Sequence, residues 1–231
     1  MEIMPLDHKL CTFNCVYCEC GWNEPVAHPH LPTREEVKTA LEEKLLSLDG
    51  PLSTITFSGN GEPTLHPDFL GIIEDTCALR DRYCPSAKVS VLSNSTQLGR
   101  EEVVQALRLC DNRILKLDAA TDTMMRSIDL PVNEHLSVST IMKWLGQFNG
   151  DFTLQTCFLR GKHNGECIDN TTPAELNAWY QAVETLRPKQ IMMYVIDRKT
   201  PEEHLEKISR TEMETIAAPL IAKGYDVVIS A

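Results

Sequence analysis

The sequence predicts an α/β fold, a partial and open (β/α)6-type barrel with parallel strands, in a single domain over residues 1–231. Two observations lead to this expectation. Short apolar runs alternate with longer segments of helical periodicity, and this alternation predicts parallel strands joined by right-handed crossovers. Six or seven such units in 231 residues fit an open barrel better than a closed eightfold one. A flat doubly wound sheet is the alternative.

The first half of the chain contains four predicted strands and four predicted helices. The strands are expected over 1–6, 53–57, 88–92 and 113–117, and the helices over 33–48, 67–82, 101–109 and 134–148. A long loop, 7–32, follows the first strand. Thr33 and Glu36 predict a capping box at the start of the first helix.

The second half continues the alternation. Strands are expected over 152–159, 190–196 and 225–229, and helices over 172–186 and 211–223. Pro173 and Glu175 are typical of a helix start with a capping box. Pro219 is expected to kink the last helix, and Gly224 suits its end. In either α/β architecture the functional residues lie at the carboxyl ends of the strands.

Composition narrows the classes of function. The chain has 33 acidic and 22 basic residues, a net charge of −11. This balance disfavours a nucleic-acid partner, although Arg160, Lys162, Arg198 and Lys199 could form a local basic patch. No run of eighteen apolar residues and no apolar segment near the start are present. We therefore expect a cytoplasmic protein that does not enter a membrane.

Three of the nine cysteines stand close together in the long loop. Cys11, Cys15 and Cys18 occur in C-T-F-N-C-V-Y-C. Thiolate ligands select iron–sulfur clusters, zinc or copper(I), and three thiolates leave one iron of a [4Fe–4S] cluster open for a substrate or cofactor. Zinc is the alternative, with Cys20, or His28 and His30, completing the ligand set. Three buried thiols would be the purely structural explanation.

The spacing C-x3-C-x2-C with an aromatic residue before the last cysteine resembles the signature of the radical S-adenosylmethionine (SAM) superfamily. The resemblance implies that Cys11, Cys15 and Cys18 are the catalytic residues. They would ligate a [4Fe–4S] cluster as its metal-binding residues, with SAM at the open iron. It also implies that Tyr17, in the aromatic position, packs near the adenine of SAM.

Further positions match the same family. Residues 58–63 read S-G-N-G-E-P and resemble the family's G-G-E type motif, with one residue inserted. The resemblance implies that Gly59, Asn60, Gly61 and Glu62 bind the methionine end of SAM. By the same resemblance Asn94, after the third strand, contacts the methionine or ribose part.

The fourth predicted strand carries two more candidates. Lys116 and Asp118 are two residues apart, so they point to the same side of the strand. The resemblance implies that they contact the SAM carboxylate or ribose. A buried ion pair between them is an equal alternative. Gln155, on the fifth strand, is a weaker candidate for SAM or substrate.

The strings P-L-D-H-K-L-C-T-F-N-C-V-Y-C-E-C-G-W and F-S-G-N-G-E-P-T-L-H-P are similar to small radical SAM proteins near the wyosine-type tRNA-modifying branch. The resemblance implies reductive cleavage of SAM to a 5′-deoxyadenosyl radical. It also implies an external one-electron reductant of flavodoxin or ferredoxin type. The substrate is expected to be a small molecule, peptide or protein. The alternatives are tRNA modification or a non-catalytic zinc- or cluster-binding module.

Overall fold

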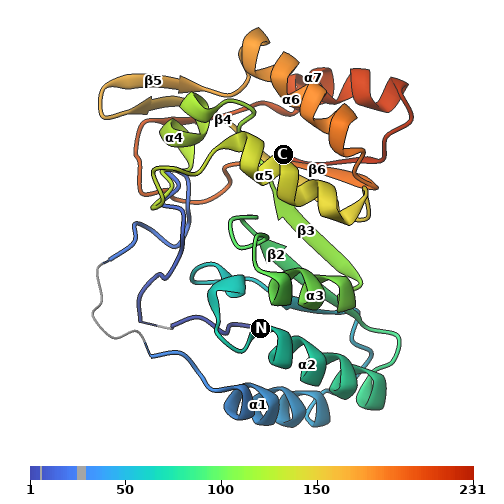
Figure 1. Ribbon diagram of the computed structural model, residues 1–231. Helices are drawn as coiled ribbons and strands as arrows, with labels where there is room; N and C mark the ends of the chain where they lie inside the picture. Colours follow the sequence, from blue (N-terminus) through green and yellow to red (C-terminus); the bar gives the residue numbers. More distant parts are fainter. Residues whose placement is uncertain (6, 25–29) are drawn as a thin grey trace. The chain divides into compact units, whose positions relative to one another are not determined.

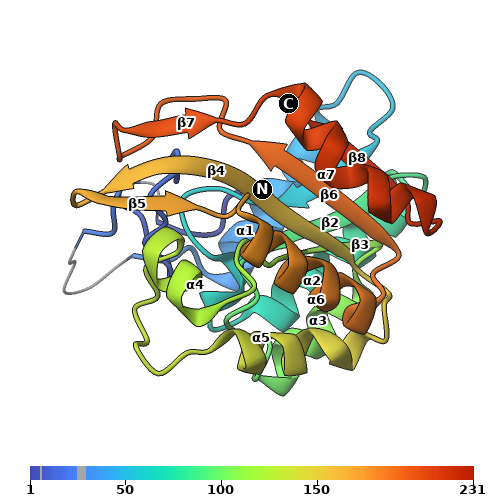
Figure 2. The same cartoon turned by 90° about the horizontal axis from the view of Figure 1, so that it is seen from above.

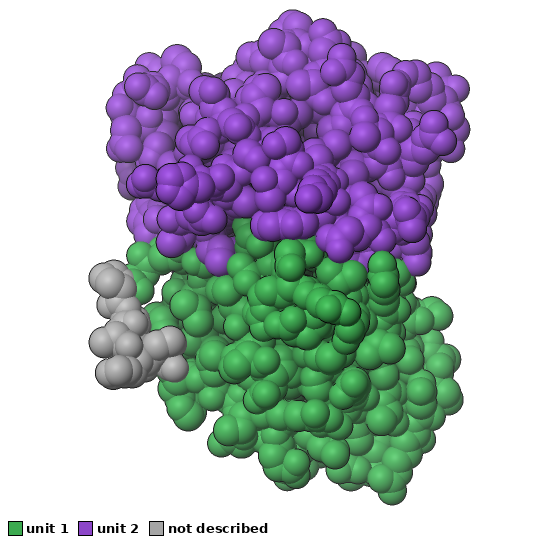
Figure 3. All heavy atoms as spheres, viewed as in Figure 1, with its two compact units in different colours: residues 1–11, 23–114 green, residues 12–22, 115–231 purple. Residues whose placement is uncertain are grey.

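The computed structural model describes residues 1–5, 7–24 and 30–231. The chain divides into two compact units, coloured separately in Figure 3. Unit 1 comprises residues 1–11 and 23–114, and unit 2 comprises residues 12–22 and 115–231. The loop that carries Cys11, Cys15 and Cys18 (residues 11–18, called the cysteine loop below) therefore contributes to both units. The expected single domain over 1–231 stays a prediction.

In its described residues, unit 1 contains three α-helices, a 3-10 helix and parallel strands. Its elements are α1 (Arg34–Leu46), β1 (Thr54–Phe57), the 3-10 helix η1 (Pro63–Leu65), α2 (Phe69–Tyr83), β2 (Lys88–Ser93), α3 (Glu101–Leu109) and the first part of β3 (Asn112–Lys116). The three α-helices lie side by side along β1 and β2 (Figure 1). Phe57, Ile73, Val89 and Leu107 are fully buried between these layers.

Unit 2 continues from the end of β3. Its elements are α4 (Asp122–Ile128), α5 (Val138–Leu145), the 3-10 helix η2 (Gly146–Phe148), β4 (Thr153–His163), β5 (Glu166–Asp169), α6 (Pro173–Leu186), β6 (Gln190–Val195), β7 (Leu205–Lys207), α7 (Arg210–Ala222) and β8 (Val227–Ser230). Phe152, Leu154, Ile191 and Met213 belong to its core.

The sheet follows the chain order β1-β2-β3-β4-β6-β8. The pairs β1–β2, β4–β6 and β6–β8 are parallel. A doubly wound sheet would reverse its order at a switch point, so this sequential order confirms the predicted open (β/α) barrel with parallel strands.

Three strand predictions need correction. Residues 1–5 do not form a strand: the amino group of Met1 bonds Thr56 O, but Met4 N–H is taken by the Glu2 carboxylate instead of a neighbouring strand. Leu6 lies outside the described residues. β4 ends four residues later than predicted, and its far half pairs antiparallel with two strands that the sequence did not predict, β5 and β7 (Figure 2). These strands are too short to leave a periodic pattern.

The helix predictions differ mainly at their ends. Thr33 forms the predicted capping box with Glu36. Thr172 caps α6, but the Glu175 carboxylate accepts from the Thr121 hydroxyl and does not close the box. The start predicted at Thr211 is wrong, because Ser209 caps α7 and forms the box with Glu212.

Other helices were missed or placed too early. The predicted helix 134–148 begins only at Val138, after Ser137 caps it. α4 was not predicted, because its seven residues show little periodicity. The predicted helix 67–82 begins two residues late, because α2 starts at Phe69, and it is preceded by the 3-10 helix η1 at residues 63–65, which was not predicted.

Candidate functional site

The predicted site residues divide between the two units. Unit 1 holds Cys11, the Gly59–Glu62 turn and Asn94, and unit 2 holds Cys15, Tyr17, Cys18, Lys116 and Asp118. Each group gathers at the carboxyl end of its strands, where the α/β fold places functional residues. The two groups are described in turn.

The Gly59–Glu62 turn follows β1 and is fastened to the segment that leads into Cys11. Asn60 donates from Nδ2 to the carbonyl oxygens of Pro5, at 3.0 Å, and His8, at 2.9 Å. Leu10 N–H donates to Asn60 O, at 3.3 Å, and Glu62 N–H donates to Leu10 O, at 3.0 Å. The inserted Asn60, which departs from the family motif, thus holds the cysteine loop.

Both glycines of the turn are required by close protein contacts. Gly59 has φ +148° and Gly61 has φ +145°, in the region that favours glycine. A Cβ on Gly59 would lie 1.7 Å from the Glu2 carboxylate, and one on Gly61 would lie 2.0 Å from Leu10 O. A larger residue at position 61 would therefore push away the backbone of Leu10, the residue that precedes Cys11.

Glu62 is buried, and its carboxylate is occupied by its own unit. It accepts from the Ser93 hydroxyl at 2.8 Å, from Asn94 N–H at 2.6 Å, and from both the N–H and the hydroxyl of Thr64. Burial raises the pKa of Glu62, and these hydrogen bonds oppose the shift. Glu62 therefore orders the end of β2.

Asn94 connects that end of β2 to the first predicted ligand. Its Nδ2 donates to Cys11 Sγ at 3.4 Å. Its Oδ1 accepts from Thr96 N–H and hydroxyl, at 3.0 and 2.8 Å, which fixes the orientation of the amide. A neutral N–H group is thus directed at the Cys11 sulfur.

In unit 2 the cysteine loop is paired with the segment after α4. Asn14 N–H donates to Asp129 O, Val16 N–H donates to Ile128 O, and Val132 N–H donates to Thr12 O, each at 2.9 Å. Cys15 is buried by this pairing, whereas Cys18 is half-buried. These backbone hydrogen bonds fix the conformation of residues 12–16 within unit 2.

Lys116 lies at the centre of a buried charged cluster. Its ammonium forms an ion pair with Asp118 Oδ2 at 2.8 Å and donates to Asp129 Oδ1 at 2.8 Å and to Cys15 Sγ at 3.1 Å. Cys15 Sγ in turn donates to Asp129 Oδ1 at 3.5 Å. The predicted Lys116–Asp118 ion pair is present.

The charges in this cluster shift one another's titration. Burial would lower the pKa of Lys116, but the carboxylates of Asp118 and Asp129 raise it well above its ordinary value. Burial raises the pKa of Asp129 to about 7, against the opposing effect of Lys116. One cation serves two carboxylates, so the group carries more negative than positive charge when all are ionised.

Tyr17 is buried and linked to the same cluster. Its hydroxyl donates to Asp118, and the Tyr194 hydroxyl donates to Tyr17 at 3.2 Å. Asp118 also accepts from Cys157 N–H at 2.8 Å. Burial, followed by the negative charge of Asp118, raises the pKa of Tyr17. Gln155 is not part of this group in the structure: its amide contacts Met192 Sδ at 3.6 Å.

Two residues of the cluster escaped sequence reasoning. Asp129 lies in I-D-L-P, just after a helix that was not predicted, and Tyr194 stands near the end of β6. The only available signal for Asp129 was a carboxylate between apolar residues, which burial makes unusual. No local pattern connects it to Lys116.

Zinc and an iron–sulfur cluster make different demands on the donor set of this site. Within the described ranges, no three His, Cys, Asp or Glu side chains form a ready metal-binding group. His28, a zinc candidate, lies outside the described residues, and Cys20 is exposed. Two of the three predicted ligands, Cys11 and Cys15, accept N–H donors at sulfur, as metal-bound thiolates do. The residues present fit a thiolate-held cluster.

Comparison with known proteins gives a family and a fold. A family model described as "Radical SAM superfamily" matches residues 8–142. A relative from Brachyspira hyodysenteriae named "GTPase Obg" is 26% identical over 219 residues, which are 93% of this chain and 30% of that protein. A "UPF0026 protein" of Helicobacter pylori is 26% identical over 156 residues, 66% of this chain and 49% of the relative. The chain thus spans less than half the length of these relatives.

Solved structures show the same fold. Streptococcus suis SuiB bound to S-adenosylmethionine superposes with a TM-score of 0.72 at 12% identity, over 100% of this chain and 50% of SuiB. A structure of TYW1 with a lysine-pyruvate adduct superposes with a TM-score of 0.65 at 16% identity, over 94% of this chain and 72% of TYW1. At these identities the likeness extends to the fold alone.

Proposed function

The chain belongs to the radical SAM superfamily, whose cofactors are a [4Fe–4S] cluster and SAM, and from this premise we propose that Cys11, Cys15 and Cys18 hold the cluster. The observation that carries the proposal is the pair of N–H donors at the sulfurs of Cys11 and Cys15. A thiolate ligand is stabilised by such donors more than a neutral thiol, whose sulfur is only a weak acceptor. When bound, the cluster supplies the electron that cleaves SAM reductively to a 5′-deoxyadenosyl radical.

The protein's own groups have separate tasks in this reaction. The Gly59–Asn60–Gly61 turn is proposed to face the methionine end of SAM at the carboxyl end of β1. Tyr17 is proposed to border the adenine. Buried Phe13 and Val16 help to exclude water from the cysteine loop. An external one-electron reductant of flavodoxin or ferredoxin type would supply the electron.

Reconstitution tests the ligand assignment. Anaerobic loading with iron and sulfide should give about four irons per chain, as the cluster type requires. Cys11→Ala, Cys15→Ala and Cys18→Ala should each lose the cluster and the release of 5′-deoxyadenosine. Cys20→Ala is the matched control, because that side chain is exposed in the same loop, and it should keep both. Retention of the cluster by Cys15→Ala would refute the assignment.

For the substrate we propose a peptide or protein segment. A structure of SuiB, which shares the fold, is described as bound to the precursor peptide SuiA, with a TM-score of 0.70 at 12% identity, over 100% of this chain and 48% of SuiB. In the described part of unit 2, β5 and β7 each pair with β4 on one side, which leaves backbone edges that an extended peptide can use. A search of the described residues finds no helix with the length and hydropathy that a membrane span requires. Separately, we propose a cytoplasmic location.

The substrate class can be tested with extract from the source cells. Extract should increase 5′-deoxyadenosine release by the loaded, reduced enzyme. Protease treatment of the extract should abolish the increase, and RNase treatment should leave it intact. The opposite pattern would favour the tRNA-modifying alternative. If the extract is passed through a small-molecule cut-off filter and the increase is found with the filtrate, the substrate is a metabolite.

A further inference from the structure

Two residues that the family resemblance places at SAM, Lys116 and Asn94, are directed at cysteine sulfurs instead, and two others, Glu62 and Asp118, contact these two residues. We propose that Lys116 and Asn94 are positioning residues that hydrogen-bond Cys15 and Cys11 and so set the reduction potential of the cluster, while Glu62 and Asp118 hold them in place. The inference rests on the proposed function, in which these cysteines are the ligands. It differs from the resemblance, which assigns these side chains to SAM.

Lys116 has a full complement of partners within unit 2. An ammonium group has three N–H donors. Asp118, Asp129 and Cys15 supply three acceptors, at 2.8, 2.8 and 3.1 Å. A SAM carboxylate could accept a hydrogen bond from Lys116 only by displacing one of these buried acceptors. Displacing either aspartate would leave a buried carboxylate without its cation.

Asn94 is held just as firmly within unit 1. Its backbone N–H donates to Glu62 at 2.6 Å, and its Oδ1 accepts from the N–H and hydroxyl of Thr96. These bonds leave Nδ2 directed at Cys11 Sγ. Glu62 is itself satisfied by Thr64, Ser93 and Asn94, so its carboxylate acts through Asn94 and does not need a ligand ammonium.

Donors at a ligand sulfur have a known effect on an iron–sulfur cluster. Hydrogen bonds to the sulfurs and nearby positive charge favour the reduced, more negative form and so raise the reduction potential. The Lys116 ammonium carries a full charge and sits 3.1 Å from its sulfur, while the Asn94 amide is neutral at 3.4 Å. Lys116 should therefore contribute the larger part.

The experiment compares Lys116→Met, Lys116→Arg and Asn94→Asp with the wild-type protein, each reconstituted anaerobically. Iron content, the midpoint potential from EPR-monitored titration, and SAM affinity from equilibrium dialysis are measured for each. Asn94→Asp keeps the Oδ1 acceptor for Thr96 but removes the amide donor. The matched control is Lys88→Met, which removes a lysine from an exposed ion pair with Asp111 at the opposite end of the strands.

Lys116→Met should lower the potential by an amount equal to at least a tenfold change in the one-electron reduction equilibrium, about 59 mV. Its SAM affinity should stay within about twofold of the wild type. Lys116→Arg should recover most of the potential, Asn94→Asp should shift it in the same direction as Lys116→Met, and Lys88→Met should not move it.

The inference is overturned if Lys116→Met or Asn94→Asp weakens SAM binding tenfold and leaves the potential unchanged. If Lys116→Met fails to fold, Asn94→Asp alone decides between these outcomes. The proposed function fails in a different way, namely if the wild-type chain takes up no cluster or Cys15→Ala retains one. The iron measurement therefore separates the two failures.

Discussion

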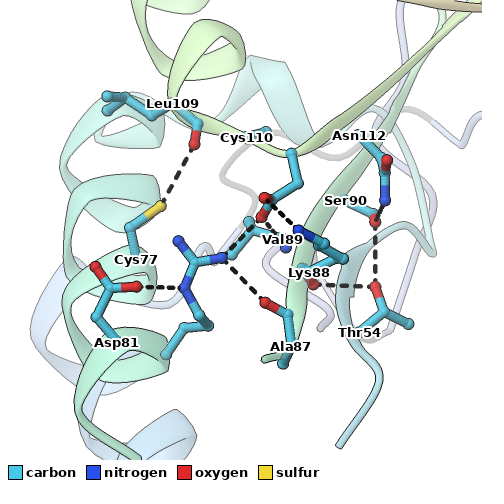
Figure 4. Close-up of polar contacts among 12 residues, drawn as sticks. Thr54, Cys77, Asp81, Ala87, Lys88, Val89, Ser90, Leu109, Cys110 and Asn112 are labelled. Carbon is cyan, nitrogen blue, oxygen red and sulfur yellow. Dashed lines mark hydrogen bonds and ion pairs between the residues drawn. The ribbon is translucent and has the colours of Figure 1, made fainter. Parts of the chain in front are cut away.

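The two ends of β3 carry two polar networks of different character. Near its start, in unit 1, Asp111 accepts from Arg80 at 2.7 Å, from Lys88 at 3.3 Å and from Val89 N–H at 2.9 Å (Figure 4). Arg80 also pairs with Asp81 at 2.6 Å. Two cations here face two carboxylates, and the group is partly open to solvent. Fold stability explains this network fully.

At its other end, in unit 2, β3 finishes at the buried cluster of Lys116, Asp118 and Asp129. One cation faces two carboxylates and a cysteine sulfur, and burial makes such an imbalance unfavourable for folding. The comparison shows where the fold keeps its functional charge. Balanced pairs stabilise the start of the strand, and an excess that stability does not require is kept at its carboxyl end.

The sulfurs differ in the same way. In unit 1, the thiols of Cys77 and Cys110 donate to carbonyl oxygens, at 3.8 Å to Leu109 and at 3.4 Å to Ala106. At the carboxyl ends, Cys11 accepts from an amide, and Cys15 accepts from an ammonium and donates to Asp129 Oδ1 at 3.5 Å. The sulfurs of Cys77 and Cys110 thus donate to carbonyl oxygens, whereas those of Cys11 and Cys15 have N–H donors directed at them.

The largest effect is expected from Asp118→Ala. This change leaves the Tyr17 hydroxyl and Cys157 N–H without their buried acceptor and removes one of the two carboxylates that pair with Lys116. The free energy of unfolding should fall by about 3–5 kcal/mol. Denaturant unfolding of the cluster-free protein measures it. A loss below about 1 kcal/mol would mean that the buried group of charged residues around Lys116 contributes little to the fold, and the difference between the two ends of β3 would not hold.

A smaller effect is expected from Asp111→Ala in the other network. Water can replace part of what Arg80 and Lys88 lose, because Lys88 is largely exposed, but Val89 N–H loses its acceptor. The free energy of unfolding should fall by about 1–3 kcal/mol. Cluster content and SAM affinity after reconstitution should match the wild type. A change in the midpoint potential would contradict the separation of the two networks.

Cys110 gives a pH-dependent test that concerns the first network. Burial raises the pKa of the Cys110 thiol to about 12. The native protein therefore keeps this thiol protonated up to high pH, whereas the unfolded chain ionises it near its ordinary value of 9. Its contribution to stability is complete below pH 9 and is lost as the pH rises from 9 towards 12.

Alkylation with iodoacetamide at pH 8 checks this prediction by peptide mapping of the cluster-free protein. The exposed Cys20 and Cys167 should react, and Cys110 should react only when denaturant opens the fold. Reaction of Cys110 at the rate of Cys167 under native conditions would show that burial does not protect it.

Local sequence patterns were sufficient for the order of the elements, but not for partners distant in the chain. The capping box of Thr33 and Glu36 and the apolar strand before Ser93 depend on residues that are close in sequence. The capping pattern and the hydrophobic periodicity therefore reveal them. β5 and β7 pair with the part of β4 that extends past its parallel partners. The local sequence of β5 or β7 does not show that this part of β4 is available for pairing. The pattern L-K-L-D placed Lys116 and Asp118 on one face but could not show what lies opposite.

The same limit applies to the site. The spacing of the cysteines identified the candidate ligands, since those residues are close in sequence. Asp129 lies 114 residues after Cys15 in the chain. Its contacts with Lys116 and Cys15 depend on where α4 ends beside the cysteine loop. Asn60 was recognised as an inserted residue, but its contacts with Pro5 and His8 require the folded turn.

The smallest effect is expected from charge reversal at Arg160, where we predict no measurable change in RNA binding. Most of the affinity of an RNA binder comes from cations that neutralise phosphates. Arg160 is already paired with Glu212 at 2.7 Å and bonded to Thr171, and Arg198 is paired with Glu19 at 2.9 Å.

These strand-end pairs extend the comparison to the surface, because Arg160 and Arg198 each face a carboxylate, as Arg80 and Lys88 do beside Asp111. Filter binding of bulk tRNA at ~50 and ~200 mM salt should show no retention at micromolar protein, for wild type and Arg160→Glu alike. Micromolar binding that falls steeply with salt and is lost in Arg160→Glu would show that these pairs open for phosphate, and the tRNA-modifying alternative would then replace the peptide substrate.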